Sequence, residues 1–322
     1  DYVSDSNLEL GLVAQRTETQ VNFWPRQLYQ LDDDTAAYLA NFDPEIEDDP
    51  YAFQTSFNIP GYMNIDSWTV SGSAGMDLGP VLGLDGLDTT LVVAGSHMNI
   101  RQYQDLDTSP ADLIRLFGDA EDYSQHSLEW RFTGLGGAPF GWGQGVTFVT
   151  GLYALQADYY INTGIEAGED LATYALSDSG LTLISGGAIA GIPFAGGGTV
   201  AGALGPLLGP LVGTAVGEDR YTFDFRQRTR TFAAFGQLTW DLSEHWSVTP
   251  GLRLNHERKN IDSVGTSSCR TKPVTQQCLV QLIVGANDYS FSDLESTETN
   301  LSPKLSVLYR ADDDLRVFAT WA

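Results

Sequence analysis

Few residues of this chain have the types and spacing that metal or nucleophile chemistry requires. The four histidines, His97, His126, His245 and His256, are scattered, and none has a second His or Cys at the spacing of a metal site. No serine nucleophile elbow, Walker loop or HExxH pair is present. We therefore expect no enzyme activity, no cofactor and no metal site.

Acidic clusters and two cysteines remain as candidates for binding or covalent chemistry. The acids at 32–34 and 45–49 lack EF-hand spacing, so a solvated acidic surface is favoured over calcium binding. Cys269 and Cys278 flank a short polar segment with Pro273 near its middle. Paired cysteines persist in oxidising compartments, so we expect a disulfide between them. The alternative interpretations are a pair of thiolates that bind a metal ion and two free thiols.

The composition argues against nucleic acid as a partner. The chain has 322 residues and a net charge of −25, with 17 basic and 42 acidic residues. Phosphate contacts need clustered Lys and Arg, and no basic run of five or more occurs. Glycine is abundant at 34 residues. We expect no nucleic-acid binding.

Strand-like alternation of apolar and polar residues recurs along the whole chain. No amphipathic helix stands out. The alternation predicts an all-β protein with nine strands, at 8–14, 67–78, 89–105, 125–132, 145–161, 221–240, 246–262, 290–310 and 315–321.

The two sides of these strands differ in polarity. In 231–240, one side carries Phe232, Leu238 and Trp240, whereas the other side carries Gln237. Such a strand fits a large soluble sheet with one buried face, or a barrel wall between lipid and a wet lumen.

The cost of placing charge in lipid favours the barrel wall. In 246–257, a shift by one residue would turn Arg253 and Glu257 toward lipid, and an arginine near the midplane costs roughly 2–4 kcal/mol. In the register that avoids this cost, the residues expected to face the lumen are Glu129, Arg131, Gln237, Arg253, Glu257, Lys304 and Arg310. The residues expected in the interfacial girdles are Trp240, Trp246, Tyr309 and Trp321.

Short and long connections alternate strictly between the expected strands. The short ones lie near 79–88, 135–144, 241–245 and 311–314, and the long ones at 20–63, 106–122, 163–220 and 263–290. An outer-membrane barrel has this asymmetry, because short turns face the periplasm and long loops face outside. The pattern predicts an antiparallel transmembrane β-barrel wall.

One segment, 179–217, contains no charged residue. By length it could form a transmembrane helix. However, Pro193, Pro206 and Pro210 interrupt it, and a single crossing there would reverse the strands that follow. We expect it in the long outer loop 163–220. It is either a compact glycine-rich loop or an apolar surface for a ligand, lipid or partner.

Four short motifs in the last third of the chain resemble the barrel of TonB-dependent receptors, most closely the siderophore-receptor-like branch. Their order and spacing carry the resemblance, which is good over 221–322 and looser over 122–162. The motifs are Phe235-Gly236-Gln237, Gly251-Leu252-Arg253, Ser302-Pro303-Lys304 and Val317–Ala322.

The resemblance implies a larger protein than this chain. Barrels of that family have about 22 strands around a plug, so we expect residues 1–322 to be an internal part of the barrel. The plug domain and the C-terminal strands would then lie elsewhere in the receptor.

The implied function is TonB-dependent uptake, in a Gram-negative outer membrane, of a scarce ligand such as an iron–siderophore complex. The implied partners are TonB, outer-membrane lipid and the small-molecule ligand. A passive porin-type channel and a secreted soluble β-protein that binds glycans are the alternatives.

Overall fold

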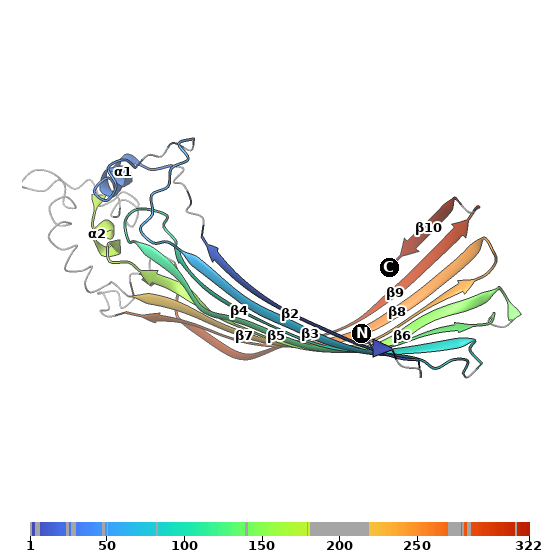
Figure 1. The fold of residues 1–322 in the computed structure, drawn as a ribbon. Coiled ribbons are helices and arrows are strands. Elements are labelled where there is room, and N and C mark those ends of the chain that lie inside the picture. Colours follow the sequence, from blue (N-terminus) through green and yellow to red (C-terminus); the bar gives the residue numbers. More distant parts are fainter. Residues whose placement is uncertain are drawn as a thin grey trace, which may run out of the picture.

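In a computed structural model, the described part of the chain forms one curved β-sheet with two short helices, α1 and α2, at one end (Figure 1). All ten strands pair with their sequence neighbours, and every pair is antiparallel. The structure describes residues 2–3, 7–23, 26, 30–46, 49, 51–81, 83–138, 141–178, 180, 219–269, 278, 280–281, 285–312 and 314–322.

The nine longer strands correspond to the nine expected from the sequence, and β1 adds a tenth of two residues. The fold class, an antiparallel barrel wall that is only part of a barrel, is confirmed. The strands are β1 (Tyr2–Val3), β2 (Leu8–Asn22), β3 (Tyr62–Asp77), β4 (Gly86–Asp105), β5 (Ile114–Gly136), β6 (Gly145–Ala167), β7 (Arg220–Asp241), β8 (Trp246–Ser268), β9 (Tyr289–Arg310) and β10 (Arg316–Trp321).

Several strands are longer than expected, and the connection expected at 106–122 is only 106–113. Both register shifts, between Ile100 and Gln102 in one strand pair and between Gly118 and Ala120 in the other, come from one extra residue in β5 near Asp119. A β-bulge adds one residue to a strand and so shifts its alternation by one position. The alternation seen from residue 125 onward therefore does not continue in the same phase through 114–124, although the strand does.

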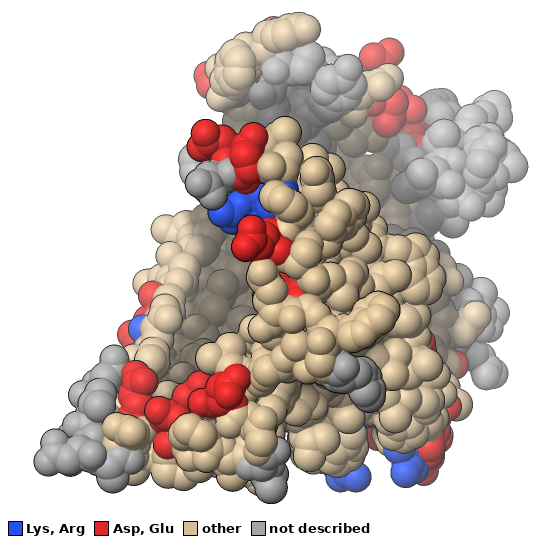
Figure 2. All heavy atoms as spheres, turned by 90° about the vertical axis from the view of Figure 1, so that its right-hand side faces the viewer, with Lys and Arg blue, Asp and Glu red and all other residues tan. Residues whose placement is uncertain are grey.

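The short turns and the longer connections lie at opposite ends of the sheet (Figure 1). The connections 23–61, 106–113, 168–219 and 269–288 all leave the end that carries the helices, as predicted. The charge-free segment 179–217 belongs to one of them, but apart from Gly180 it lies outside the described residues. Figure 2 looks onto the end with the short turns and shows acidic side chains gathered there in separate clusters.

The two helices were not expected from the sequence, because both are too short to show a helical period. Helix α1 (Asp33–Leu39) begins after Asp32, whose carboxylate accepts a hydrogen bond of 2.9 Å from the Thr35 N–H. A hydrogen bond of 2.6 Å from the Thr35 hydroxyl, followed in effect by this N–H bond, lowers the pKa of Asp32. The acids at 32–34 thus start a helix, where negative charge is favourable. Helix α2 (Leu171–Ala175) is shorter still.

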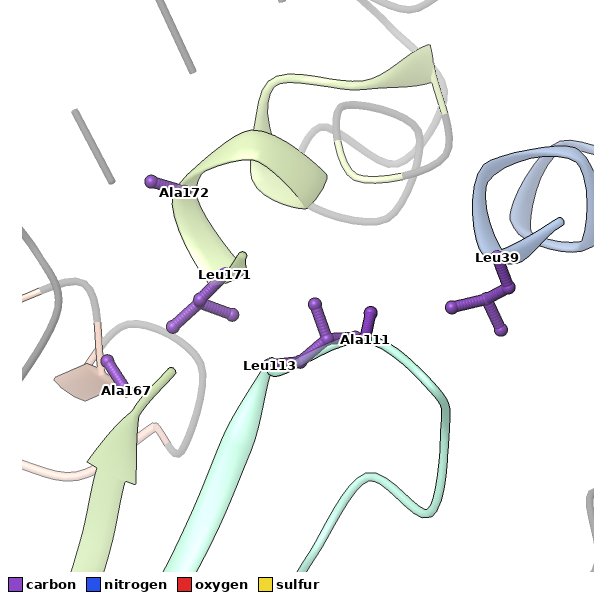
Figure 3. Packing of buried hydrophobic residues seen from close by; sticks show 6 residues of the cluster. All are labelled: Leu39, Ala111, Leu113, Ala167, Leu171 and Ala172. Atoms are coloured by element: carbon purple, nitrogen blue, oxygen red, sulfur yellow. The ribbon is translucent and has the colours of Figure 1, made fainter. Parts of the chain in front are cut away.

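The helices pack together over the end of the sheet in a small apolar core (Figure 3). This core joins three connections that are far apart in sequence, so the outer end of the sheet carries one packed cap. Its buried residues are Leu39, Ala111, Leu113, Ala167, Leu171 and Ala172.

Asp112 ties two of these connections together. Its carboxylate accepts hydrogen bonds from the Arg115 guanidinium and from the Glu169 N–H at 3.1 Å, and its own N–H donates to Asp170 Oδ2 at 2.9 Å. Burial alone would raise the pKa of Asp112, but the bonds from Arg115 and Glu169 lower it below its ordinary value. The stabilising contribution is therefore present at neutral pH and is lost as the pH falls through the lowered pKa.

We predict that Asp112→Asn loosens the cap. The substitution removes the charge that Arg115 pairs with, at a cost of about 1–3 kcal/mol. Hydrogen exchange of the full-length receptor should show the amides of 168–175 exchanging about tenfold faster or more. Asp119→Asn, an exposed carboxylate at the nearby bulge, is the matched control. Equal exchange in both variants would contradict the role given to Asp112.

Candidate functional site

The register places all seven residues expected to face the lumen on one face of the sheet, here called the Gln237 face. Residues directly opposite each other on neighbouring strands share a face. The pairs Gln237–Gly251 and Gly251–Lys304 extend this face from β7 to β9. Side-chain contacts agree, because Lys304 Nζ donates to Gln237 Oε1 at 3.2 Å. That this face lines a lumen stays a prediction.

Several charges on the Gln237 face are paired with an opposite charge or lie against aromatic rings. Glu257 forms an ion pair of 2.8 Å with Lys259, and Arg310 donates to Ser247 Oγ at 2.9 Å. The Arg253 guanidinium lies over the rings of Tyr153 and Phe235, at 5.8 and 5.9 Å from their centroids. A polar face with internally matched charges suits a water-filled interior.

The opposite face, here called the Leu252 face, carries an exposed apolar band. Phe232 is 62% exposed and Leu301 58%, and no part of the described chain covers them. On β7 the band runs from Phe232 to Trp240, and on β9 from Leu301 to Tyr309. These lengths match a transmembrane β-strand, which needs about 9–11 residues.

The four residues expected in the girdles all lie on the Leu252 face. Trp246 is directly opposite Tyr309, and their ring centroids are 4.7 Å apart. Trp240 donates its indole N–H to the Trp142 carbonyl at 2.9 Å, and Trp321 is opposite Leu305. Their role at a membrane interface stays a prediction.

The apolar band crosses the sheet at an angle to the rows of paired residues. Ala14 on β2 is linked, pair by pair, with Arg230 on β7 and Thr297 on β9. The same row is therefore apolar at one edge of the sheet and charged or polar at the other. Strands that tilt through a membrane at 35–45° produce this offset, as in a barrel wall.

Beyond the band, toward the cap, the two faces exchange character. On β7 the Leu252 face changes from Phe232 to Arg230, Arg228 and Arg226. The Gln237 face changes in the opposite sense and carries the aromatic residues 221, 223 and 225. This exchange is what a barrel wall needs where its strands extend beyond a hydrocarbon layer, because an outer face in water is polar.

Aromatic side chains gather on the Gln237 face at the cap end, in a group we call the mouth wall. Phe225 is 6.1 Å from Tyr159 and 6.1 Å from Phe223 between ring centroids, and Tyr289 and Phe291 are 5.8 Å apart. The mouth wall consists of Tyr159, Tyr221, Phe223, Phe225, Tyr289 and Phe291.

The mouth wall is held in place by hydrogen bonds and by one glycine. Tyr159 donates to Glu121 Oε1 at 2.9 Å, and the hydroxyls of Tyr289 and Ser263 are 3.1 Å apart. A side chain at Gly265 would collide with the rings of Tyr221 and Tyr289, so glycine lets both rings lie across β8. Rings fixed in this way offer apolar faces and a few hydroxyls, the usual composition of a ligand site.

The sequence pattern missed the mouth wall. The signal was present in "RYTFDFR" at 220–226, where aromatic and polar residues alternate. A strand over 221–240 was expected, but its two faces were assigned only from 231–240, so the Gln237 face was not followed into 221–225.

The family follows from the whole length of the β-sheet. Residues 6–322 match the family model described as "TonB dependent receptor-like, beta-barrel". The chain belongs to this family. No curated protein matches the sequence. Among the described residues of this TonB-dependent receptor barrel, no helix is long and apolar enough to cross a membrane.

Two solved receptors share the fold. The ferric yersiniabactin uptake receptor FyuA from Yersinia pestis has a TM-score of 0.57 and 15% identity, with 98% of this chain and 34% of FyuA covered. The ferric-catecholate import receptor Fiu from E. coli K12 has a TM-score of 0.54 and 12% identity, with 98% of this chain and 40% of Fiu covered. The chain thus spans well under half of the length of either receptor.

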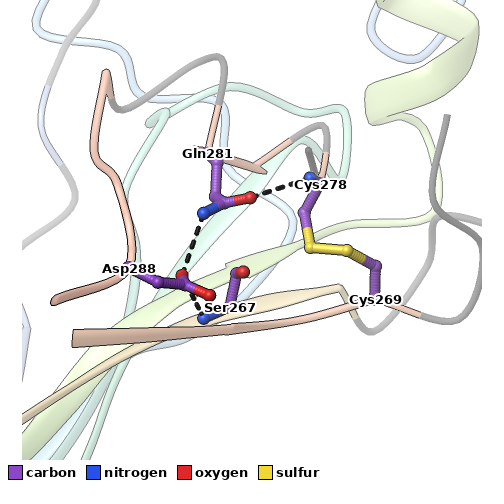
Figure 4. Close-up of a disulfide and its surroundings, with 5 residues drawn as sticks. All are labelled: Ser267, Cys269, Cys278, Gln281 and Asp288. Carbon is purple, nitrogen blue, oxygen red and sulfur yellow. Dashed lines mark hydrogen bonds between the residues drawn. A yellow bond between two sulfur atoms is a disulfide. The ribbon is translucent and has the colours of Figure 1, made fainter. Parts of the chain in front are cut away.

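The receptor's two cysteines are joined by a disulfide where β8 ends (Figure 4). Their Cα atoms are 5.6 Å apart, within the usual range for a bridge. Cys278 donates its N–H to Gln281 Oε1, and Gln281 in turn donates to Asp288 Oδ1, both at 2.9 Å. The bridge and these bonds tie Cys278 and Gln281 to the end of β8 and to the residue before β9, beside the mouth wall.

The cysteines also belong to the single cluster among the described residues with metal-like spacing. Asp219, Cys269 and Cys278 offer atoms within 4.8 Å of one another. A thiolate is the form of cysteine that binds metal, and the two sulfurs are bonded to each other. The disulfide therefore takes precedence over a metal at this cluster.

We predict that this disulfide forms in the protein in solution. Peptide mapping without reductant should recover the peptides with Cys269 and Cys278 linked, and neither cysteine should react with maleimide. Changing both to serine should lower stability by roughly 2.5–3 kcal/mol, because the bridge closes a short loop. Modification of both thiols in the unreduced protein would rule out the bridge.

Proposed function

We propose that this protein is part of an outer-membrane receptor that takes up a scarce ligand, such as an iron–siderophore complex, with energy supplied through TonB. The observation that carries the proposal is the mouth wall. It is an aromatic surface on the Gln237 face, beside the cap, on a chain of the TonB-dependent receptor family.

The chemistry of the mouth wall supports a small ligand with flat or apolar parts. Ring faces stack on planar groups, and the hydroxyls of Tyr159, Tyr221 and Tyr289 are hydrogen-bond partners for its polar edges. The solved receptors FyuA and Fiu, which share the fold, carry ferric ligands according to their names. An iron chelate with organic arms is the ligand class that joins these two observations.

The apolar band and the position of the cap support the orientation. We place the band in the outer membrane of a Gram-negative bacterium, with the cap outside the cell and the short turns in the periplasm. The TonB contact belongs to another part of the receptor, and this segment supplies barrel wall and outer surface. No enzyme activity is proposed, since the family is one of receptors.

Uptake of radiolabelled iron in cells that carry the full-length receptor tests the proposal. The probes are ⁵⁵Fe complexes of a catecholate, a hydroxamate and a mixed chelator. We expect at least one complex to enter only when the receptor gene and TonB are both intact. Uptake that persists without TonB would indicate a passive channel, and no uptake of any complex would contradict the iron-chelate ligand.

A further inference from the structure

A column of arginines lies on the Leu252 face directly above the apolar band. Arg226, Arg228 and Arg230 occupy alternate positions of β7, so they point to the same side of the sheet with about 7 Å between neighbours. All three are exposed. Arg258 on β8 is directly opposite Arg230 and shares this face. Four of the chain's 17 basic residues thus gather on two strands. Asp158, Asp224, Asp262 and Glu295 lie on the same face of these strands and their neighbours.

Carboxylates of the described part of the chain form ion pairs with only two of these four arginines. Arg228 forms an ion pair of 2.6 Å with Asp158, and Arg258 forms one of 2.5 Å with Glu295. Arg226 lies over the ring of Tyr160 at 4.9 Å. Among the described residues, no carboxylate lies within 4.0 Å of the guanidinium of Arg226 or Arg230.

Two features show that the arrangement lacks a partner. Arg230 and Arg258 are like charges directly opposite each other, a placement that destabilises a sheet. Asp262 stands directly opposite Arg226, yet its carboxylate accepts the Asp293 N–H at 2.8 Å. An anion bound between the guanidinium groups would relieve both the repulsion and the missing pairing.

The position of the four arginines next to the apolar band indicates which kind of anion they bind. The last apolar residue of the band on β7, Phe232, is followed at the next position on the same face by Arg230. In the orientation proposed above, this step is the border between hydrocarbon and the headgroups of the outer leaflet. Guanidinium groups bind phosphate in a bidentate manner, and basic pockets beside a membrane bind phosphorylated headgroups.

We propose that Arg226, Arg228, Arg230 and Arg258 form a binding site for the phosphates of outer-leaflet glycolipid. The site lies on the outside of the barrel, on the face opposite the mouth wall, and is separate from ligand uptake. It rests on the membrane orientation proposed above and not on the identity of the transported ligand.

Native mass spectrometry of the full-length receptor, extracted from membranes in nonionic detergent, tests this site. The probes are diphosphoryl lipid A, its dephosphorylated form and inorganic pyrophosphate. We expect the phosphorylated lipid to bind at least about tenfold tighter than the dephosphorylated one, since each cation near the headgroups contributes about 1 kcal/mol. Tight binding of pyrophosphate alone would instead indicate a site for free anions and overturn the lipid assignment.

The variant R226Q/R228Q/R230Q should lose the preference for phosphorylated lipid. The matched control R131Q/R253Q/K304Q removes three positive charges from the Gln237 face and should keep it. The same preference in both triple variants, or none in the wild-type receptor, would overturn the proposal.

Folding is checked separately, by the heat-dependent gel mobility of the extracted receptor. If the triple glutamine variant fails to fold, R230Q alone should weaken the binding of phosphorylated lipid by about fivefold. An unchanged affinity in folded R230Q would count against the site. If the triple glutamine variant loses the lipid preference but keeps iron uptake, the lipid site is independent of the proposed uptake function.

Discussion

Replacing Leu305 with arginine should destabilise the full-length receptor in a bilayer by about 2–4 kcal/mol. Leu305 lies at the middle of the apolar band on β9 and is 44% exposed. An arginine there would place its charge at the midplane, where no described side chain offers a partner. The free energy of unfolding, measured by denaturant titration in lipid vesicles, gives the size of the effect.

The neighbouring position provides the control for depth. Ser306 lies on the Gln237 face, and Ser306→Arg should change the unfolding free energy by less than about 1 kcal/mol. Equal destabilisation by both substitutions would mean that both faces meet the same solvent. A larger loss at Ser306 would reverse the assignment of the two faces.

Replacing Phe225 or Phe291 with alanine should weaken ligand binding by about tenfold or more each. Both rings belong to the mouth wall, and fixed aromatic anchors at the centre of a binding surface typically contribute about 2 kcal/mol or more. The probe is the ferric complex that the uptake experiment identifies. Its dissociation constant is measured on the full-length receptor in detergent by fluorescence quenching.

Phe232→Ala is the matched control for this pair. Phe232 is the same residue type on the same strand as Phe225, but it lies on the Leu252 face. Its removal should leave ligand affinity unchanged. If Phe225 and Phe291 behave like Phe232, the mouth wall is not the ligand surface.

The sequence predicted the half of the sheet near the short turns well, for a physical reason. Within the membrane each face meets one solvent, so a strand such as 246–257 keeps a strict alternation that fixes which way Arg253 points. The register places Arg253 on the Gln237 face and Leu252 on the opposite face. The order of short and long connections followed from the same strands.

The half of the sheet near the cap was not predicted, because the polarity of each face changes along the strands there. From Arg230 toward the cap, the Leu252 face is polar and the Gln237 face is aromatic. Apolar and polar residues still alternate there, but the apolar ones are on the other face. The bulge next to Gly118 in β5 adds a further shift of phase. A reading based on one constant pattern therefore placed the start of β5 too late and did not find the mouth wall.

The cap lay beyond sequence reasoning for a different cause. Helix α1 spans seven residues and α2 five, which is too short for a helical period. Their stability comes from contacts such as Leu39 with the 106–113 connection, which no local pattern reveals. Asp32 was the one local signal, as an N-cap residue within an acidic run.

Spin-label accessibility along β7 of the full-length receptor, in lipid vesicles, tests the reversal of the two faces most directly. Single labels are placed from 221 to 240 and exposed to oxygen, which partitions into lipid, and to a water-soluble nickel chelate. We predict that labels at 232, 234, 236, 238 and 240 respond to oxygen. Labels at 226, 228 and 230, on the same face, should respond to the nickel chelate. A stronger response to oxygen than to the nickel chelate at labels on the Gln237 face would contradict the account. So would the same response at 232 and 230 on the Leu252 face.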